Sequence, residues 1–179
     1  MATPIPYEPV QFFFGLLWSD KASRDRALAA AQELWGPIES PWGPVPFTYT
    51  DYYDAEMGEG IRREFHAIRN LRQPDALADD KLSAIRLEIE SSAGSGRNRS
   101  VNLDPGFLDR FKLVLASAKN GPNRIPLGKG IYGEVTMLFR AGEFEPHRLT
   151  YRDYASDVVR TYFGELRRDY LEKLRNASR

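Results

Sequence analysis

Four carboxylates within nine residues form the first cluster of the sequence that could do chemistry. They are Asp51, Asp54, Glu56 and Glu59, in the segment TDYYDAEMGEG. Carboxylates this close repel one another unless a cation or basic groups offset their charge, and their oxygens suit magnesium or calcium. The spacing is not that of an EF-hand loop. The alternative is a solvated hairpin tip, which we favour for Asp54 and Glu59, whereas both interpretations stay open for Asp51 at the end of the preceding strand.

A second candidate pair, Asn102 and Asp104, stands in the segment SVNLDPG. Alternation along a strand would place both side chains on one face, which suits a site that needs an amide and a carboxylate side by side. However, Asp-Pro-Gly also fits the first three positions of a type II turn. We therefore expect Asp104 to form a turn, and a role in ligand binding is the minority interpretation.

Glu134 is the third candidate, because it lies in the middle of the strand-like segment GIYGEVTMLF. Glutamate is disfavoured in strands, and an ionised side chain among apolar neighbours needs a partner. Lys119, at the end of the preceding strand-like segment, is the expected partner. Arg63, one of several basic residues that could bind phosphate if they converge, and Tyr132, close to Glu134, complete the candidate ligand-binding residues.

The composition excludes several classes of function. The 25 basic and 25 acidic residues cancel, which disfavours a dedicated nucleic-acid binder. There is no cysteine, so disulfides, thiolate nucleophiles and zinc-thiolate sites are excluded, and two histidines are too few for a histidine-rich metal site. The longest apolar run, FFFGLLW, is far below the roughly 20 residues of a membrane helix. With no signal-peptide pattern at the start, we expect a cytoplasmic protein without a membrane partner.

The elements that would position these residues follow from hydrophobic periodicity and turn signals. Residues 1–9 read as an extended lead-in, the proline-rich stretch 37–46 as a loop, and 91–99 as a mobile loop rich in glycine, serine and arginine. Leu82, Ile85 and Ile89 form the expected buried stripe of the second helix. The expected strands cover 10–18, 47–53, 61–70, 100–103, 111–117 and 130–140, and the expected helices cover 21–35, 74–90 and 156–176.

This order predicts a single α+β domain over residues 1–179. Its first six elements match the ferredoxin-like βαββαβ arrangement, extended by two further strands and a C-terminal helix. In a sheet of strand order 4-1-3-2, the candidate residues divide between two rims. Asp104 falls alone at one rim, and the other rim gathers Asp51, Glu56, Lys119, Tyr132 and Glu134.

Four stretches together resemble one bacterial family, domain of unknown function 4416. They are FFFGLL, FTYTDYYDAEMG, VNLDPGFL with KLVLASAK, and IPLGKGIYGEVTMLF followed by TYRDY. The resemblance covers nearly the whole chain but implies no established activity. Members often carry an automatic "GTP-binding" label, which this sequence does not support. Its nearest approach to a P-loop, GPNRIPLGKG, has six residues between the glycines and Gly130 where a hydroxyl should stand.

The leading interpretation is a small enzyme or ligand-binding protein with an acid-base cleft for an anionic, nucleotide-like ligand, with or without a divalent cation such as magnesium. The alternative is a non-catalytic protein-interaction module that docks a partner through the aromatic face of the last helix. RNA binding comes third, because the aromatic RNP pattern is absent. The candidate catalytic residues are Asp51, Lys119 and Glu134; the ligand-binding residues are Arg63, Asn102, Asp104 and Tyr132; and the metal ligands are Asp51, Glu56 and Glu134.

Overall fold

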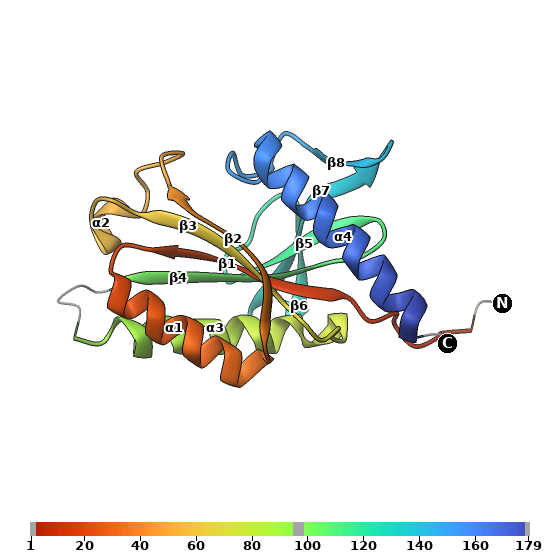
Figure 1. Ribbon diagram of the computed structural model, residues 1–179, viewed down its shortest axis with the longest axis horizontal. Helices are drawn as coiled ribbons and strands as arrows, with labels where there is room; N and C mark the ends of the chain where they lie inside the picture. The colour runs from red at the N-terminus through yellow and green to blue at the C-terminus, as the bar shows by residue number, and fades with distance from the viewer. Residues whose placement is uncertain (1–2, 95–98, 178–179) are drawn as a thin grey trace.

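The computed structural model describes residues 3–94 and 99–177, and it shows an α+β protein built on one antiparallel sheet (Figure 1). The strands are β1 (Gln11–Trp18), β2 (Ile38–Pro46), β3 (Arg62–Ile68), β4 (Val101–Leu108), β5 (Lys112–Ser117), β6 (Arg124–Gly128), β7 (Ile131–Arg140) and β8 (Glu143–Pro146). The helices are α1 (Lys21–Trp35), α2 (Asp54–Met57), α3 (Leu77–Ser92), which follows a 3₁₀ turn (Pro74–Ala76), and α4 (Asp157–Ala177).

The strands lie in the order β2-β3-β1-β4-β5-β7-β6, and β8 pairs with the far end of β7. Every pairing is antiparallel. We call β2, β3, β1 and β4 the first half of the sheet, and β5 to β8 the second half. The two halves are joined by only three register pairs, Gly106–Leu115, Phe107–Val114 and Leu108–Leu113. Towards the start of β4 the halves separate, and we call this place the seam.

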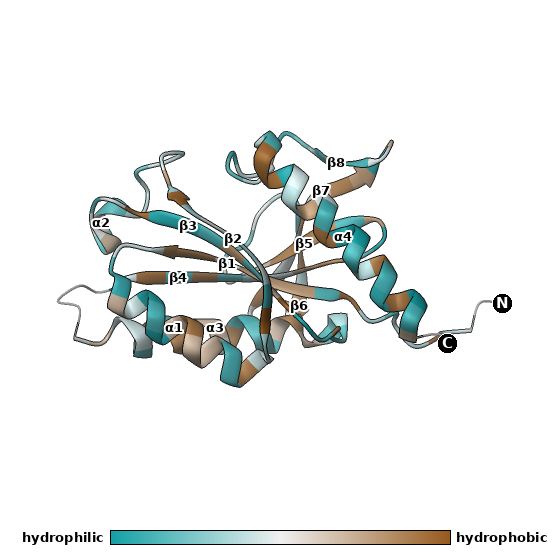
Figure 2. Ribbon diagram, in the orientation of Figure 1, coloured by the Kyte–Doolittle hydropathy of each residue, from teal (hydrophilic) through white to brown (hydrophobic). Residues whose placement is uncertain are grey.

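Helices cover both faces of the sheet. Helices α1 and α3 lie side by side under the first half, and α4 crosses the opposite face (Figure 1). Hydrophobic residues run along the central strands, whereas α4 shows hydrophilic and hydrophobic residues alternating along its length (Figure 2). Alternation along β1 supplies both cores, because Phe12 and Phe14 pack under α1 while Phe13 packs under α4.

The first strand and helix form as their sequence predicts. All but the last residue of β1 are buried, as expected for a strand covered on both faces. The Asp20 side chain accepts a hydrogen bond from the Ser23 amide and caps α1. Gly36, with a φ of 104°, ends the helix. The predicted stripe of α4 is also confirmed, since Tyr162, Phe163 and Tyr170 are buried in the core. Among these three aromatic residues, none remains exposed to dock a partner.

The predicted strand over residues 47–53 is wrong, and so is the loop over 37–46. The proline-rich stretch forms β2, and the aromatic segment after it forms a loop that leads into the short helix α2. Strand β2 is an outer strand with two register shifts against β3. Prolines are tolerated at the edge of a sheet and at bulges, because no ladder donor is needed there. The carboxylates of residues 51–59 therefore lie on the long connection between the paired strands β2 and β3, which includes α2, and not at a tight hairpin turn.

The predicted turn at Asp104 is also wrong. Strand β4 runs straight through Asp-Pro-Gly, with Asp104 opposite Gly15 and Pro105 opposite Phe14 of β1. The chain turns later, where the Asp109 carboxylate accepts from the amides of Phe111 and Lys112. Pro105 fits within the sheet because it lies at the seam, where β5 has not yet joined β4.

Helix α3 supplies side chains where β5 is missing. The Lys81 Nζ atom donates to the Leu103 carbonyl at 2.7 Å, and the Leu103 amide donates to Glu88 Oε1 at 2.8 Å. Both side chains are buried, and Lys81 Nζ lies 3.8 Å from Glu88 Oε1. The expected apolar stripe of this helix is therefore wrong in part: Ile89 is 68% exposed. The helix buries a polar face because it has backbone groups to satisfy.

Some expectations remain untested. The predicted lead-in and mobile loop fall partly on residues 1–2 and 95–98, which lie outside the described residues.

None of the helices in the described part of the chain has the length and apolar character that crossing a membrane requires.

Candidate functional site

The buried guanidinium of Arg63 lies at the centre of the seam. Strand β3 points Arg63 towards α4, and the residue is 5% exposed. Its Nη2 atom donates to Asp153 Oδ2 at 2.7 Å, and its Nη1 atom lies 3.8 Å from Asp104 Oδ2. Burial alone would lower the pKa of Arg63, but the charge of Asp153, followed by Tyr154 and Asp104, raises it overall. The guanidinium therefore stays charged inside the protein.

We call Arg63, Asp104, Asp153 and Tyr154 the buried group. Three polar atoms of this group have no hydrogen-bond partner among the described residues. They are Nε and Nη1 of Arg63 and the Tyr154 hydroxyl. Both side chains are more than nine-tenths buried. They approach β1 so closely that a Cβ atom on Gly15 would lie 2.9 Å from Arg63 Nη1 and 3.0 Å from Tyr154 Oη. Donors buried without an acceptor are costly, so the group is suited to an oxygen supplied by water or a ligand.

Asp104 is the member of this group that solvent reaches. Its side chain is 24% exposed, compared with 5% for Asp153. Asp104 Oδ2 accepts from Asn102 Nδ2 at 2.8 Å, and Lys81 Nζ lies 3.5 Å from Oδ1. Its two nearest cations, Lys81 and Arg63, therefore lie beyond the length of a strong charge-assisted hydrogen bond. A carboxylate held in this way keeps lone pairs free to accept further hydrogen bonds.

Surface side chains from several loops contact one another in series, and two of their tyrosines, Tyr53 and Tyr151, respond to the charge of Asp104. Tyr52 packs edge-on against Tyr53 with 5.0 Å between ring centroids, and the Lys119 ammonium lies 4.9 Å from the centroid of Tyr52. Arg124 donates to the Lys119 carbonyl and to the Tyr151 hydroxyl. Burial raises the pKa of Tyr53, and the Asp104 charge raises it further. We call Tyr52, Tyr53, Lys119, Arg124 and Tyr151 the surface ring.

Glu134 belongs to this ring through Arg124, and not through the expected partner Lys119. Its Oε2 atom accepts from Arg124 Nε at 2.7 Å and lies 3.3 Å from the Tyr151 hydroxyl. Glu134 is 2% exposed, so its partner is needed to offset the cost of burial. Burial, and then the Glu134 charge, raise the pKa of Tyr151 to about 12. Tyr151 therefore stays protonated near neutral pH and can donate a hydrogen bond.

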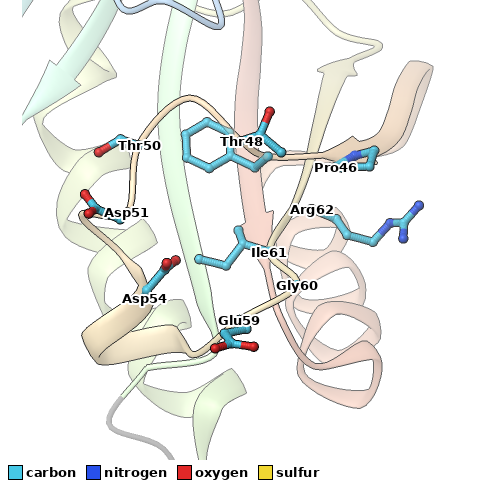
Figure 3. A pocket seen from close by; sticks show the side chains of 10 residues that line it. Pro46, Thr48, Thr50, Asp51, Asp54, Glu59, Gly60, Ile61 and Arg62 are labelled. Atoms are coloured by element: carbon cyan, nitrogen blue, oxygen red, sulfur yellow. The ribbon is translucent and has the colours of Figure 1, made fainter.

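The acidic segment is divided between two places. Asp51, Asp54 and Glu59 line a shallow cavity of about 520 Å³ (Figure 3). Phe47 and Ile61 contribute apolar side chains to its lining. Arg62 also lines the cavity, but its guanidinium points away from the carboxylates (Figure 3). The Phe47 ring separates this cavity from the buried group, since it lies 5.3 Å from the Arg63 guanidinium.

The expected metal ligands do not come together. Glu56 pairs with Arg99, Glu134 pairs with Arg124, and Asp51 lies at the acidic cavity. Within residues 3–94 and 99–177, no group of three or more histidine or carboxylate side chains is arranged to hold a metal ion. Tyr132, another expected ligand-binding residue, lies at the start of β7 opposite Ser117 and Pro126, and its side chain forms no hydrogen bond within the described part of the chain.

The expected isolation of Asp104 is wrong as well. The structure places Asp104 beside Arg63 and Asn102, and its charge acts on Tyr53 and Tyr151 of the surface ring. Strand β4 is longer than expected, so Asp104 lies inside it and not at its far end. Asp51 lies apart from this group, at the acidic cavity.

A separate charged group on the opposite face of the sheet serves as a contrast. Glu64 accepts two hydrogen bonds from Arg24, one from Trp18, and shares one with His66. Burial would raise the pKa of Glu64, but the hydrogen bonds with His66 and Arg24 lower it to about 2. Its oxygens have protein partners on every side, which indicates a structural role. Asp104, in contrast, has only one close hydrogen bond to its carboxylate oxygens among the described residues.

The model of one protein family, described as a domain of unknown function (DUF4416), matches residues 8–170. The chain belongs to this family. The match spans every residue of the buried group and the surface ring. No curated protein and no solved structure matches the chain.

Sequence reasoning missed several residues of the site in this DUF4416 chain. Asp153, Tyr151 and Tyr154 belong to the TYRDY segment, which contributes to the family resemblance but has no strand or helix pattern of its own. Tyr53 lies in a segment that was predicted to be a strand, and Lys81 is one of several basic residues that no sequence motif singles out. The concentration of tyrosine and charge in a short loop was the only available signal for TYRDY. Its partner Arg63 lies 90 residues earlier in the chain.

Proposed function

We propose that this DUF4416 protein binds a small polar ligand with an anionic group and acts on it at Asp104 by acid-base chemistry. The observation that carries the proposal is the state of Asp104. It is a half-buried carboxylate within a strand, it has one close hydrogen bond, and its charge raises the pKa of two nearby tyrosines, Tyr53 and Tyr151. Such a carboxylate can take a proton from a bound ligand, because its oxygens are not all occupied.

The anionic part of the ligand is inferred from Lys119. Among the described residues, Lys119 forms no ion pair, and its ammonium contacts only the Tyr52 ring and hydroxyl. It is exposed at the surface ring, where Arg124 is already paired with Glu134. A cation without a carboxylate partner near a candidate base favours an anionic group on the ligand.

The other candidate residues take supporting roles in this proposal. Glu134 positions Tyr151 and Arg124, because it contacts both and is itself buried. Tyr53 would donate a hydrogen bond to the ligand, since its raised pKa keeps it protonated. The Tyr151 hydroxyl already donates to Glu134 and accepts from Arg124, so its role is to hold these two side chains in place. Arg63 and Tyr154 would stabilise negative charge that develops near Asp104. The proposal assigns no shared divalent cation to Asp51, Glu56 and Glu134, because these residues lie apart.

We also propose that β1, α1, β2, β3, α3 and β4 form a ferredoxin-like unit. The strand order β2-β3-β1-β4 and the antiparallel pairing support this assignment. The position of α1 and α3 on one face of these strands supports it further (Figure 1).

The proposal is tested by the melting temperature of purified protein with a panel of small anions, comprising inorganic phosphate, small carboxylates and nucleoside monophosphates. A ligand that binds only the folded protein raises its melting temperature, by an amount that corresponds to about 2.7 kcal/mol at 100 times its dissociation constant. We expect at least one compound to do so. Asp104→Asn should then remove turnover of that compound, because the amide cannot accept the proton.

Two variants complete this experiment. Lys119→Gln should weaken binding about tenfold at low salt, because one charge-assisted contact is lost. Asp54→Asn is the matched control, since it removes an exposed carboxylate from the neighbouring acidic cavity, and it should leave binding unchanged. If Asp54→Asn abolishes binding while Asp104→Asn and Lys119→Gln leave it intact, the site is the acidic cavity and the proposal is wrong.

A further inference from the structure

A second groove lies between the outer strand β2 and the first turns of α4. Its volume is about 360 Å³, which is within the range that accommodates a small ligand or a side chain. The groove is separate from the seam, and none of its lining residues belongs to the buried group or the surface ring. The lining residues are Trp42, Asp157, Val158, Thr161, Tyr162 and Glu165.

Two aromatic rings form one wall of this groove. The centroids of Trp42 and Tyr162 lie 6.4 Å apart, and the ring planes are inclined by 41°. Tyr162 is fixed in place because its hydroxyl donates to the Ser40 carbonyl. Trp18, another tryptophan of the chain, has two arginines over its ring. Within the described residues, the half-buried ring of Trp42 has no cation over it.

Two weakly paired carboxylates of α4 also line the groove. The side chains of Asp157 and Glu165 are 94% and 60% exposed. Among the described residues, their ion pairs are with Arg160 and Arg168, three residues further along the same helix, at 3.5 and 3.6 Å. Exposed pairs of this kind contribute little and are readily exchanged. Arg160 also has a closer partner, Glu143, at 2.9 Å.

We propose that this groove binds an organic cation, namely an alkylammonium or a guanidinium group. The cation would lie against the Trp42 ring, where the electron-rich face attracts it, and the two carboxylates would offset its charge. Val158, 62% exposed, would contact the methylene groups that carry the cation. The positive end of the α4 dipole opposes a cation, so Asp157, the first residue of the helix, is the group that must overcome it.

Intrinsic fluorescence gives a direct test, because Trp42 lines the groove. The protein is titrated with butylammonium, with a blocked peptide containing one lysine, and with the same peptide acetylated on that lysine. The signal of a Trp42→Phe variant is subtracted, which leaves the response of Trp42 alone. We expect a saturable change with both cations at millimolar concentration and none with the acetylated peptide. Tighter binding of the lysine peptide assigns the site to a protein side chain, and tighter binding of butylammonium assigns it to free amines.

Charge variants separate this proposal from nonspecific binding. The double variant Asp157→Asn, Glu165→Gln should bind the cations about tenfold more weakly. Glu172→Gln is the matched control, since Glu172 lies on the same helix, is 66% exposed and pairs with Arg175 three residues on. Its affinity should equal that of the wild type. Equal binding of the acetylated peptide, equal losses in the double variant and the control, or no saturable change with either cation would each overturn the proposal.

Discussion

At the scale of the residue, Gly15 determines how closely the buried group can approach β1. Its φ is not in the left-handed region, so the reason for glycine is space and not backbone conformation. The atoms that a side chain would meet are Arg63 Nη1, the Tyr154 hydroxyl and a carbon of the Phe65 ring. Arg63 is held by Asp153, and Phe65 belongs to the core, so neither can move away freely.

Gly15→Ala should therefore destabilise the protein by about 1–3 kcal/mol, the usual cost of overpacking a core. The control is Gly164→Ala in α4, where an added Cβ meets no atom within 4 Å. Alanine in a helix is favoured over glycine, so the control should stabilise the protein by about 0.5–1 kcal/mol. Urea denaturation measures both. A neutral Gly15→Ala would mean that Arg63 and Tyr154 are not packed against β1.

The residue scale also shows how much of the candidate site could be predicted. Arg63, Asn102 and Asp104 were named from residue type and strand alternation, and the structure brings them together. Their roles remain predictions. The pairing of Arg63 with Asp153 could not be derived, because the two residues approach only after both halves of the sheet have folded. Local patterns do not contain such contacts.

At the scale of the element, α3 satisfies backbone groups of β4 with two charged side chains. Lys81 and Glu88 bond to the carbonyl and the amide of Leu103, where a neighbouring strand would otherwise do so. Burial raises the pKa of Glu88, and the charge of Lys81 opposes this effect. The two side chains therefore depend on each other as well as on Leu103.

Lys81→Met should destabilise the protein by about 2–4 kcal/mol, because it leaves the Leu103 carbonyl and the Glu88 carboxylate without their donor. In the Lys81→Met background, Glu88→Met should lower the free energy of unfolding by less than it does in the wild type. The reason is that the second substitution removes the carboxylate that the first one left unpaired. Lys21→Met is the control, because Lys21 and Asp25 form an exposed pair, and it should change stability by less than about 0.5 kcal/mol. Strictly additive effects of Lys81→Met and Glu88→Met would show that the two groups act independently.

Prolines explain two of the errors in the predicted strands. Two more strands, β6 and β8, were not predicted at all, so four strands and not the expected two follow β4. Strand β2 was missed because its prolines favour a loop, yet an outer strand with bulges tolerates them. Strand β4 was cut short at Pro105 for the same reason. Strand β1, α1 and α4 were predicted correctly, since a long apolar run or a regular stripe dominates their sequence.

At the scale of the whole molecule, buried phenol groups hold the two halves of the sheet and α4 together. Tyr154 and Tyr162 pack against Phe65 of β3, and Tyr170 is buried in the same core. Burial raises the pKa of all three tyrosines above the usual value. The α+β class followed from the mixture of periodicities, whereas the ferredoxin-like arrangement remains a proposal.

This burial predicts an alkaline limit to stability. A group whose folded pKa lies above its unfolded value, about 10 for tyrosine, contributes stability below that pH and loses it as the pH rises towards the folded pKa. The free energy of unfolding should therefore fall above about pH 10. Ultraviolet absorbance should show some of the nine tyrosines ionising only as circular dichroism reports unfolding. Ionisation of all nine with the circular dichroism unchanged would contradict the buried positions.

The departure of β5 from β4 has a consequence for self-association. An unoccupied strand edge invites invasion by another chain, which is a common route to aggregation. At Leu103 that edge is closed by the side chains of Lys81 and Glu88, and the next residue that could offer a donor on this side is Pro105, which has none. The protein can thus keep an interrupted ladder in its interior without offering a template to its neighbours.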